Sequence, residues 1–139
     1  FGRNNLYRND EGRFTDIAPE MMGEDQASGM SVSWGDVNRD GRMDLYIANM
    51  FSAAGNRIAP QEGFSLGSSK EVRDALLRFA RGNTLLVQEE GRFKDMSEEL
   101  GVTMGRWAWS SIFTDINNDG WDDLLVANGY ITTPDPGDL

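Results

Sequence analysis

Two stretches of this sequence are copies of one another: residues 34–49, WGDVNRDGRMDLYIAN, and residues 113–128, FTDINNDGWDDLLVAN. They lie 79 residues apart, and the same offset aligns NNLYRNDEGRFTD (residues 4–16) with NTLLVQEEGRFKD (residues 83–95) without a gap. At this offset 17 of the 60 overlapping positions are identical. The chain therefore carries an internal duplication, and its fold has to be interpreted as two copies of one structural unit.

Each copy predicts short β-strands separated by Asp, Asn and Gly turns. The first turn, Asn9-Asp10-Glu11-Gly12, is typical of a β-hairpin. Eight strands are expected, over residues 4–8, 13–17, 30–34 and 43–49 of the first copy and residues 84–88, 92–96, 107–114 and 122–128 of the second. Four strands are the number in one propeller blade. We therefore expect an all-β fold of two antiparallel four-stranded β-propeller-type blades with one inserted α-helix.

The inserted helix is expected between the copies. Apolar residues recur there at positions i, i+3, i+4, i+7 and i+8, namely Val72, Ala75, Leu76, Phe79 and Ala80. Ser68 with Glu71 resembles a capping box, and Gly82 suits the C-terminal cap. This divides the chain into a first blade repeat (1–66), a helical insertion (67–82) and a second blade repeat (83–139).

The apolar stripe predicts which side of the helix is buried. We expect the helix over 69–81 to bury Val72, Leu76 and Phe79 against the blades or a neighbouring molecule. Its charged residues should then face solvent, namely Lys70, Arg73, Asp74 and Arg81. A helix that binds a partner through the same stripe is the alternative.

Composition excludes several classes of function. The 139 residues include 23 acidic and 13 basic ones, a formal net charge of −10, which argues against nucleic acid or an anionic membrane as partner. The absence of histidine and cysteine removes Ser-His and Cys-His catalysis, disulfides and ordinary zinc or copper sites. No apolar run approaches the ~18 residues of a membrane helix. Because the chain begins at Phe1 without a signal-like segment, we expect a mature form or a fragment.

Both copies carry the pattern Asp-x-Asn-x-Asp-Gly-x-x-Asp in the loop between two strands. Side chains at alternate positions of a tight loop converge, and the glycine permits the turn that brings in the next carbonyl. The expected ligands are Asp36, Asn38, Asp40, the Arg42 carbonyl and Asp44 in one loop, and Asp115, Asn117, Asp119, the Trp121 carbonyl and Asp123 in the other. About six or seven oxygen ligands suit Ca²⁺ better than Mg²⁺. The sequence therefore predicts two calcium sites.

Two other interpretations of these loops are less well supported by the sequence. Asp, Asn and Gly also gather in turns that bind no metal. Two copies in register, each with three acids that repel one another without a cation, make that interpretation weaker than calcium binding. An EF-hand needs a glutamate at position 12, whereas Ile47 and Val126 occupy it here within strand-like flanks.

The combined pattern resembles a known family. Asn-x-Leu-Tyr-x-Asn and Gly-x-Phe-x-Asp, followed by Trp-Gly-Asp-x-Asn-x-Asp-Gly-x-x-Asp-Leu-Tyr-x-Ala-Asn, are similar to the FG-GAP/VCBS repeats of integrin-like β-propellers. More narrowly, residues 50–58 (MFSAAGNRI) and 128–132 (NGYIT) resemble bacterial proteins in which such repeats precede an ASPIC/UnbV domain. The resemblance implies structural calcium and a secreted propeller, often seven-bladed, in an extracellular or periplasmic location. Two blades alone do not close a ring that normally takes ~4–8.

We therefore expect a calcium-binding structural or interaction module that is not an enzyme. Its expected partners are other propeller blades, a second copy or a larger complex. Trp107 and Trp109 alternate along one predicted strand, with Trp34 and Phe113 nearby in the repeat frame. Aromatics at this period are more typical of a blade core, and a glycan stacked on them is the further candidate. The rival hypothesis is a fragment of a propeller-based carbohydrate-active enzyme, with Glu89-Glu90 or Glu98-Glu99 as acid and base.

Overall fold

The computed structural model describes residues 3–22, 25–50, 53–61, 63–64, 67–105 and 107–129. Within them the chain forms short strands and three helices, of which only the helix over residues 70–81 was predicted, and every predicted strand is present to within a few residues. In chain order the elements are β1 (Tyr7–Asp10), β2 (Arg13–Asp16), α1 (Ala18–Met21), β3 (Gly29–Gly35), β4 (Asp44–Asn49), α2 (Ala53–Ile58), α3 (Lys70–Arg81), β5 (Thr84–Glu89), β6 (Arg92–Asp95), β7 (Ala108–Thr114) and β8 (Asp123–Asn128).

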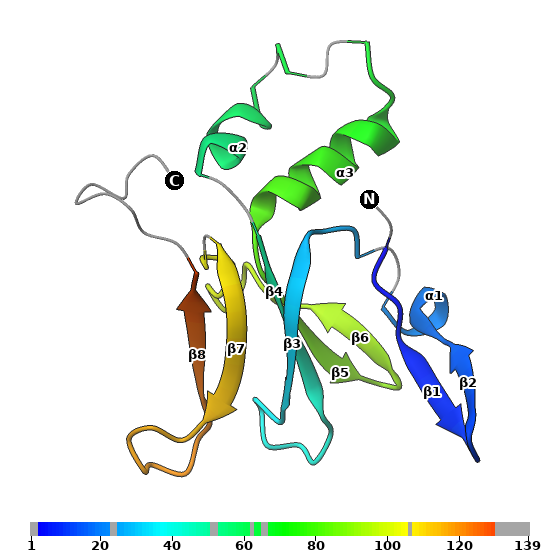
Figure 1. Cartoon of the computed structure of the whole chain (residues 1–139), viewed down its shortest axis with the longest axis vertical. Helices are drawn as coiled ribbons and strands as arrows, with labels where there is room; N and C mark the ends of the chain where they lie inside the picture. Colours follow the sequence, from blue (N-terminus) through cyan, green and yellow to red (C-terminus); the bar gives the residue numbers. More distant parts are fainter. Residues whose placement is uncertain are drawn as a thin grey trace.

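All strand pairs are antiparallel, which confirms the mostly β class. The described strands form a β1–β2 hairpin, a four-stranded sheet in the order β3-β4-β5-β6, and a β7–β8 pair (Figure 1). β4 pairs with β5, with Leu45 opposite Leu86 and Ile47 opposite Thr84, although α2 and α3 separate the two strands in the chain. The complete sheet thus takes two strands from each sequence copy.

This grouping differs from the expected one, in which the four strands of each copy pair together. By the 79-residue offset, the β1–β2 hairpin is the equivalent of the β5–β6 hairpin, and the β7–β8 pair is the equivalent of the β3–β4 pair. A repeat alignment shows the period of the structure but not where each sheet begins. The four-stranded sheet begins half a repeat later than the sequence copy does, because β4 of the first copy pairs with β5 of the second.

The copies nevertheless have the same local pairing. Gly29 lies opposite Asn49 in the first, and Ala108 lies opposite Asn128 in the second. Each pair is followed by a one-residue register irregularity, at Gly29/Ser31 and Ala108/Ser110. The duplication in sequence is therefore a duplication in backbone geometry.

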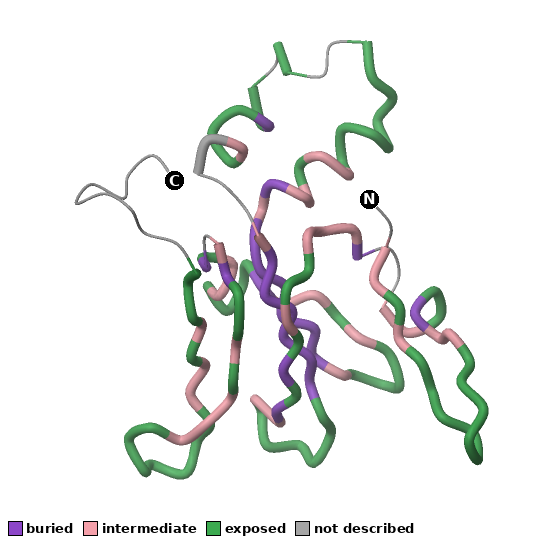
Figure 2. Tube along the Cα trace, viewed as in Figure 1, coloured by how far each residue is buried: buried purple, intermediate pink, exposed green. Residues whose placement is uncertain are grey.

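The core lies on both faces of β4 and β5, where the buried segments are concentrated (Figure 2). One face carries Tyr46, Ala48, Leu85 and Val87 and packs on the β7–β8 pair, with the Tyr46 and Phe113 rings edge to face at 6.3 Å. Leu45, Ile47 and Leu86 point to the other face, toward Met22 and Phe93. This alternation is the period of two that a strand buried on both sides requires.

Helix α3 has the predicted extent but only part of the predicted burial. Its N-cap is Ser69 and not the expected Ser68, because the Ser69 hydroxyl accepts a hydrogen bond from the backbone N–H of Val72 at 3.4 Å. The blades do not bury Val72, which is 50% exposed, while Leu76 and Phe79 are half-buried. Burial of the stripe against a neighbouring molecule stays a prediction. The stripe lines an open pocket of about 280 Å³, formed by Gln26, Val72, Ala75, Leu76 and Phe79.

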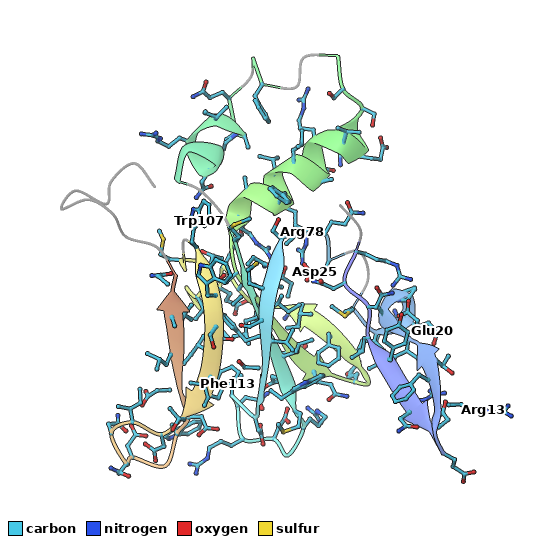
Figure 3. All side chains as sticks on the ribbon, viewed as in Figure 1. Arg13, Glu20, Asp25, Arg78, Trp107 and Phe113 are labelled. Carbon is cyan, nitrogen blue, oxygen red and sulfur yellow. The ribbon has the colours of Figure 1, made fainter. Side chains whose placement is uncertain are left out.

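The expected solvent exposure of Arg81 is also wrong, because arginines fix the C-terminal half of α3. Arg81 and Arg78 both donate to Asp95 Oδ2, at 2.6 and 2.7 Å, and Arg78 also donates to Asp25 Oδ1 at 2.6 Å. Figure 3 shows the Arg78 and Asp25 side chains next to each other. The helix lies at the ends of the strands (Figure 1) and is held there by ion pairs. Among the described residues, no helix is long and apolar enough to cross a membrane.

Candidate metal centre

The two aspartate loops join β3 to β4 and β7 to β8, at the end of the sheets opposite α3 (Figure 1). Their strands pack against each other across the cluster of Tyr46 and Phe113. As a result, both predicted sites are at the same end of the molecule.

In the first loop, aspartate and asparagine oxygens accept hydrogen bonds from the backbone. The two carboxylate oxygens of Asp36 accept from the N–H groups of Asp40 and Gly41, at 3.0 and 2.8 Å. Asn38 Oδ1 accepts from Asp40 N–H at 3.1 Å, and Asp40 Oδ1 accepts from Arg42 N–H at 2.9 Å. The polar side chains at positions 1, 3 and 5 therefore all turn inward, as the spacing predicts.

The second loop repeats these bonds. Asp115 accepts from the N–H groups of Asp119 and Gly120, at 3.1 and 2.8 Å. Asn117 Oδ1 accepts from Asp119 N–H at 3.0 Å, and Asp119 Oδ1 accepts from Trp121 N–H at 2.8 Å. The glycines at position 6 have φ of 83° in the first loop and 86° in the second, the left-handed region that glycine tolerates best. The loops thus share one conformation although their sequences differ at several positions.

The last aspartate of each pattern bonds differently from its counterpart. Asp44 is fully buried, and its carboxylate accepts from Val37 N–H at 2.9 Å and from Gln88 N–H of β5 at 2.8 Å. Asp123 accepts from Ile116 N–H at 3.0 Å and is half-buried. The difference follows from the sheet, because β5 pairs with the second edge of β4, whereas β7 is the only described strand that pairs with β8.

The central aspartates are ionised at neutral pH. The Arg42 N–H bond lowers the pKa of Asp40, with further lowering from Asn38 and the charge of Arg42. The Trp121 N–H bond lowers the pKa of Asp119, and Asn117 and the charge of Arg39 lower it further. Both carboxylates therefore present negative charge to the loop interior.

A contact between the loops was not expected from the sequence. The Arg39 guanidinium lies over the Trp121 ring, 4.7 Å from its centroid, which is within the range of a cation–π interaction. Arg39 aligns with Asn118 and Trp121 aligns with Arg42, so the contact uses two positions at which the copies differ. An arginine in one loop and a tryptophan in the other are the only sequence signal for this contact. The signal can be interpreted only when the two loops are known to be adjacent.

The donors fit calcium in kind, since each loop offers carboxylate, amide and carbonyl oxygens. Among the described residues, however, no three acidic side chains gather closely enough to form a metal cluster. The carboxylates bond to backbone N–H groups instead, and Arg42 donates to Asp40 Oδ2 at 2.6 Å. The predicted ligands of each site therefore lie together in one loop, and their side-chain oxygens accept hydrogen bonds from the backbone of that loop.

The residues of the rival hypotheses lie elsewhere. Glu89, Glu90, Glu98 and Glu99 are exposed, with Glu89 and Lys94 3.9 Å apart. Trp34 is 45% exposed and its ring lies 6.2 Å from that of Phe93, while Trp109 is 51% exposed. The glutamates occupy the β5–β6 turn and the segment after β6. Among the described residues, Glu98 lines one pocket and Glu89 and Glu90 line another, and neither pocket includes a tryptophan.

Comparison with known proteins identifies the repeat. The family profile described as FG-GAP-like repeat matches residues 1–47 and 72–126, well over half of the chain. The FG-GAP repeat profile matches residues 28–67. No curated protein and no solved structure matches the chain significantly. With its duplicated loops and antiparallel sheets, the chain belongs to the FG-GAP-like repeat family.

Proposed function

We propose that this chain is a calcium-binding propeller repeat module, secreted to an extracellular or periplasmic location, with a structural or interaction role and no catalytic activity. The observation that carries the calcium proposal is the common conformation of the two loops. Five hydrogen bonds to side-chain oxygens recur between equivalent residues of the loops, from the first aspartate to the N–H at position 7. A turn with no ligand to bind does not need three acids in each copy.

The residues that would hold the ions are the predicted ones. They are Asp36, Asn38, Asp40, Asp44 and the Arg42 carbonyl in the first loop, and Asp115, Asn117, Asp119, Asp123 and the Trp121 carbonyl in the second. Calcium supplies two positive charges that offset the repulsion among the carboxylates of one loop. Extracellular modules bind Ca²⁺ at about 10⁻⁴–10⁻³ M, so an ion at such a site is a permanent structural brace outside the cell.

The interaction role is supported by apolar side chains on the sheets. Val32 is 60% exposed, Ile112 53% and Leu125 52%. The equivalent residues of the other copy, Ser111, Ser33 and Tyr46, are half-buried or buried. Other propeller blades, a second copy or a larger complex would cover them, and a glycan on the exposed tryptophans is the secondary proposal. The association with an ASPIC/UnbV domain stays a prediction, because residues 51, 52 and 130–132 of the segments that suggest it lie outside the described residues.

Calorimetric titration of the chain with CaCl₂ tests the calcium proposal. The wild type should bind two ions, and Asp40→Asn and Asp119→Asn should each bind one. Asp10→Asn is the matched control, because Asp10 is a charged turn residue bonded to Arg8 outside both loops. Two retained ions in both loop variants, or no binding heat in the wild type, would overturn the proposal.

A further inference from the structure

The two aspartate loops share a backbone conformation but differ in charge. Residues 36–44 contain three aspartates and two arginines, a net charge of −1. Residues 115–123 contain four aspartates and no basic residue, a net charge of −4. One Ca²⁺ ion in each would therefore bring the first loop to +1 and the second to −2. Where the ligand types are the same, the more negative loop attracts a divalent cation more strongly.

One arginine of the first loop lies directly on a predicted ligand. Arg42 Nη2 donates to Asp40 Oδ2 at 2.6 Å, and Asp40 is the aspartate at position 5 of the pattern. Arg42 Nε donates to the carbonyl of Gln88 in β5 at 3.1 Å. The guanidinium group is thus fixed between the ligand carboxylate and the backbone of the neighbouring strand. It is a counter-ion for Asp40 that the chain itself supplies.

The second loop provides a matched comparison without this arginine. Asp119 Oδ1 accepts from Trp121 N–H at 2.8 Å, and Asp119 Oδ2 accepts from Asn117 Nδ2 at 2.9 Å. The corresponding distances at Asp40 are 2.9 and 2.8 Å. Trp121 stands at the position of Arg42 and carries no charge. The guanidinium bond is therefore the difference between two carboxylates that are otherwise bonded alike.

The other arginine of the first loop, Arg39, does not remove this difference. Its guanidinium lies over the Trp121 ring, 4.7 Å from the centroid, and its charge reaches the second loop from there. Even with the charge of Arg39 assigned wholly to the second loop, the two loops carry −2 and −3. The second loop remains the more negative one.

We propose that the two calcium sites are unequal: residues 115–123 form the tighter site, and in residues 36–44 the ion has to displace Arg42 from Asp40. The inference rests on the proposed function and assigns no further site, but it states which loop fills first and which side chain competes with the ion. A Ca²⁺ ion that takes Asp40 Oδ2 as a ligand breaks the bond from Arg42, because both positive groups need the same oxygen. The cost of that bond is subtracted from the affinity of the first loop.

Exposure sets the size of the effect. The Arg42 side chain is 48% exposed and that of Asp40 is 23% exposed, so solvent screens part of the attraction between them. Loss of such a pair raises a dissociation constant by about two- to fivefold. As the calcium concentration rises, the second loop therefore fills before the first.

Single-site proteins measure each loop separately. The Asp119→Asn protein keeps only the first-loop site, and the Asp40→Asn protein keeps only the second-loop site. Calorimetric titration with CaCl₂ at constant ionic strength should give a dissociation constant about two- to fivefold higher for the first loop.

Replacement of Arg42 tests the competition directly. Arg42→Gln in the Asp119→Asn protein removes the guanidinium and keeps the backbone carbonyl at that position. The dissociation constant should fall about two- to fivefold. Replacement of a residue that only supports the loop would weaken binding, so a gain in affinity separates competition from a structural role.

Arg39→Gln in the same Asp119→Asn protein is the matched control. It removes the same charge from the same loop without changing a group bonded to Asp40. Its dissociation constant should change by less than about twofold, because solvent and salt screen a charge that is not in contact with the ligand.

The outcomes separate this inference from the proposed function. Equal dissociation constants for the two loops, or equal effects of Arg42→Gln and Arg39→Gln, would overturn the inference while both sites still bind calcium. Unchanged or weaker binding in the Arg42→Gln variant would overturn it as well. No binding heat in the wild type would overturn the proposed function and this inference with it.

Discussion

The guanidinium group of Arg78 donates to the carboxylate of Asp25 at 2.6 Å, and the Asp25 side chain is fully buried. Asn4 Nδ2 donates to the other oxygen of that carboxylate at 2.8 Å. The ion pair joins α3, which is inserted between β4 and β5, to the segment that precedes β3 and to the chain leading into β1. A single buried charge thus positions the helix and the first hairpin together.

Removal of Arg78 should therefore destabilise the fold strongly. Arg78→Ala leaves Asp25 buried without its counter-ion, and such a loss costs about 3–5 kcal/mol of unfolding free energy. Arg73→Ala is the control, since Arg73 lies exposed on the same helix. Urea denaturation measures the difference, and equal midpoints for the two variants would contradict this role of the pair.

The contribution of Asp95 should depend on pH. Burial raises the pKa of Asp95, but hydrogen bonds from Ser97, Arg78 and Arg81 outweigh it and lower the pKa from 3.8 to about 2. Because the folded pKa lies below the unfolded one, the stabilisation is present above about pH 4 and is lost as the pH falls toward 2.

The comparison of wild type with Asp95→Asn isolates that carboxylate from the other acids. At pH 7 the wild type should be more stable by on the order of 2 kcal/mol, and the difference should shrink between pH 4 and pH 2. Denaturation curves at several pH values measure it. A difference that stays constant down to pH 2 would show that the ionised carboxylate is not the cause.

Calcium should raise the melting temperature. A site with free Ca²⁺ at tenfold its Kd gains about 1.4 kcal/mol, and two independent sites gain about twice that. Asp40→Ala and Asp119→Ala should each remove about half of the increment, and Mg²⁺ should restore little of it after chelation. Differential scanning calorimetry measures the melting temperature. A melting temperature that changes with neither chelator nor calcium would refute the prediction.

Gly41 should be intolerant of a side chain although there is room for one. A Cβ at this position meets nothing within 4 Å, so the cost comes from its φ of +83°. Gly41→Ala should lose about 1–2 kcal/mol, the penalty of left-handed backbone. Gly63→Ala is the matched control, because its site is equally open and its φ lies outside that region. Equal stability of the two variants would show that the loop relaxes without cost.

The strands, the inserted helix and the two loops could all be predicted from the sequence, for local reasons. Strand alternation, turn residues and the 3.6-residue stripe of α3 are short-range patterns that each copy repeats. The duplicated Asp, Asn and Gly positions also predicted which oxygens turn inward, because an Asx turn depends on residues no more than five apart. None of these features depends on which other elements pack against it in the folded chain.

The tertiary structure alone decided which strands share a sheet and what the helix packs on. The pairing of β4 with β5 joins residues 37 to 41 positions apart, and no local pattern states on which side of a repeat the partner lies. The positions of Arg78 and Arg81 follow from carboxylates that are distant in sequence, so Arg81, which was expected in solvent, is half-buried. Long-range contacts depend on which strand edges and which charged side chains lie next to each other in the folded chain. A single sequence does not indicate which distant residues form these contacts.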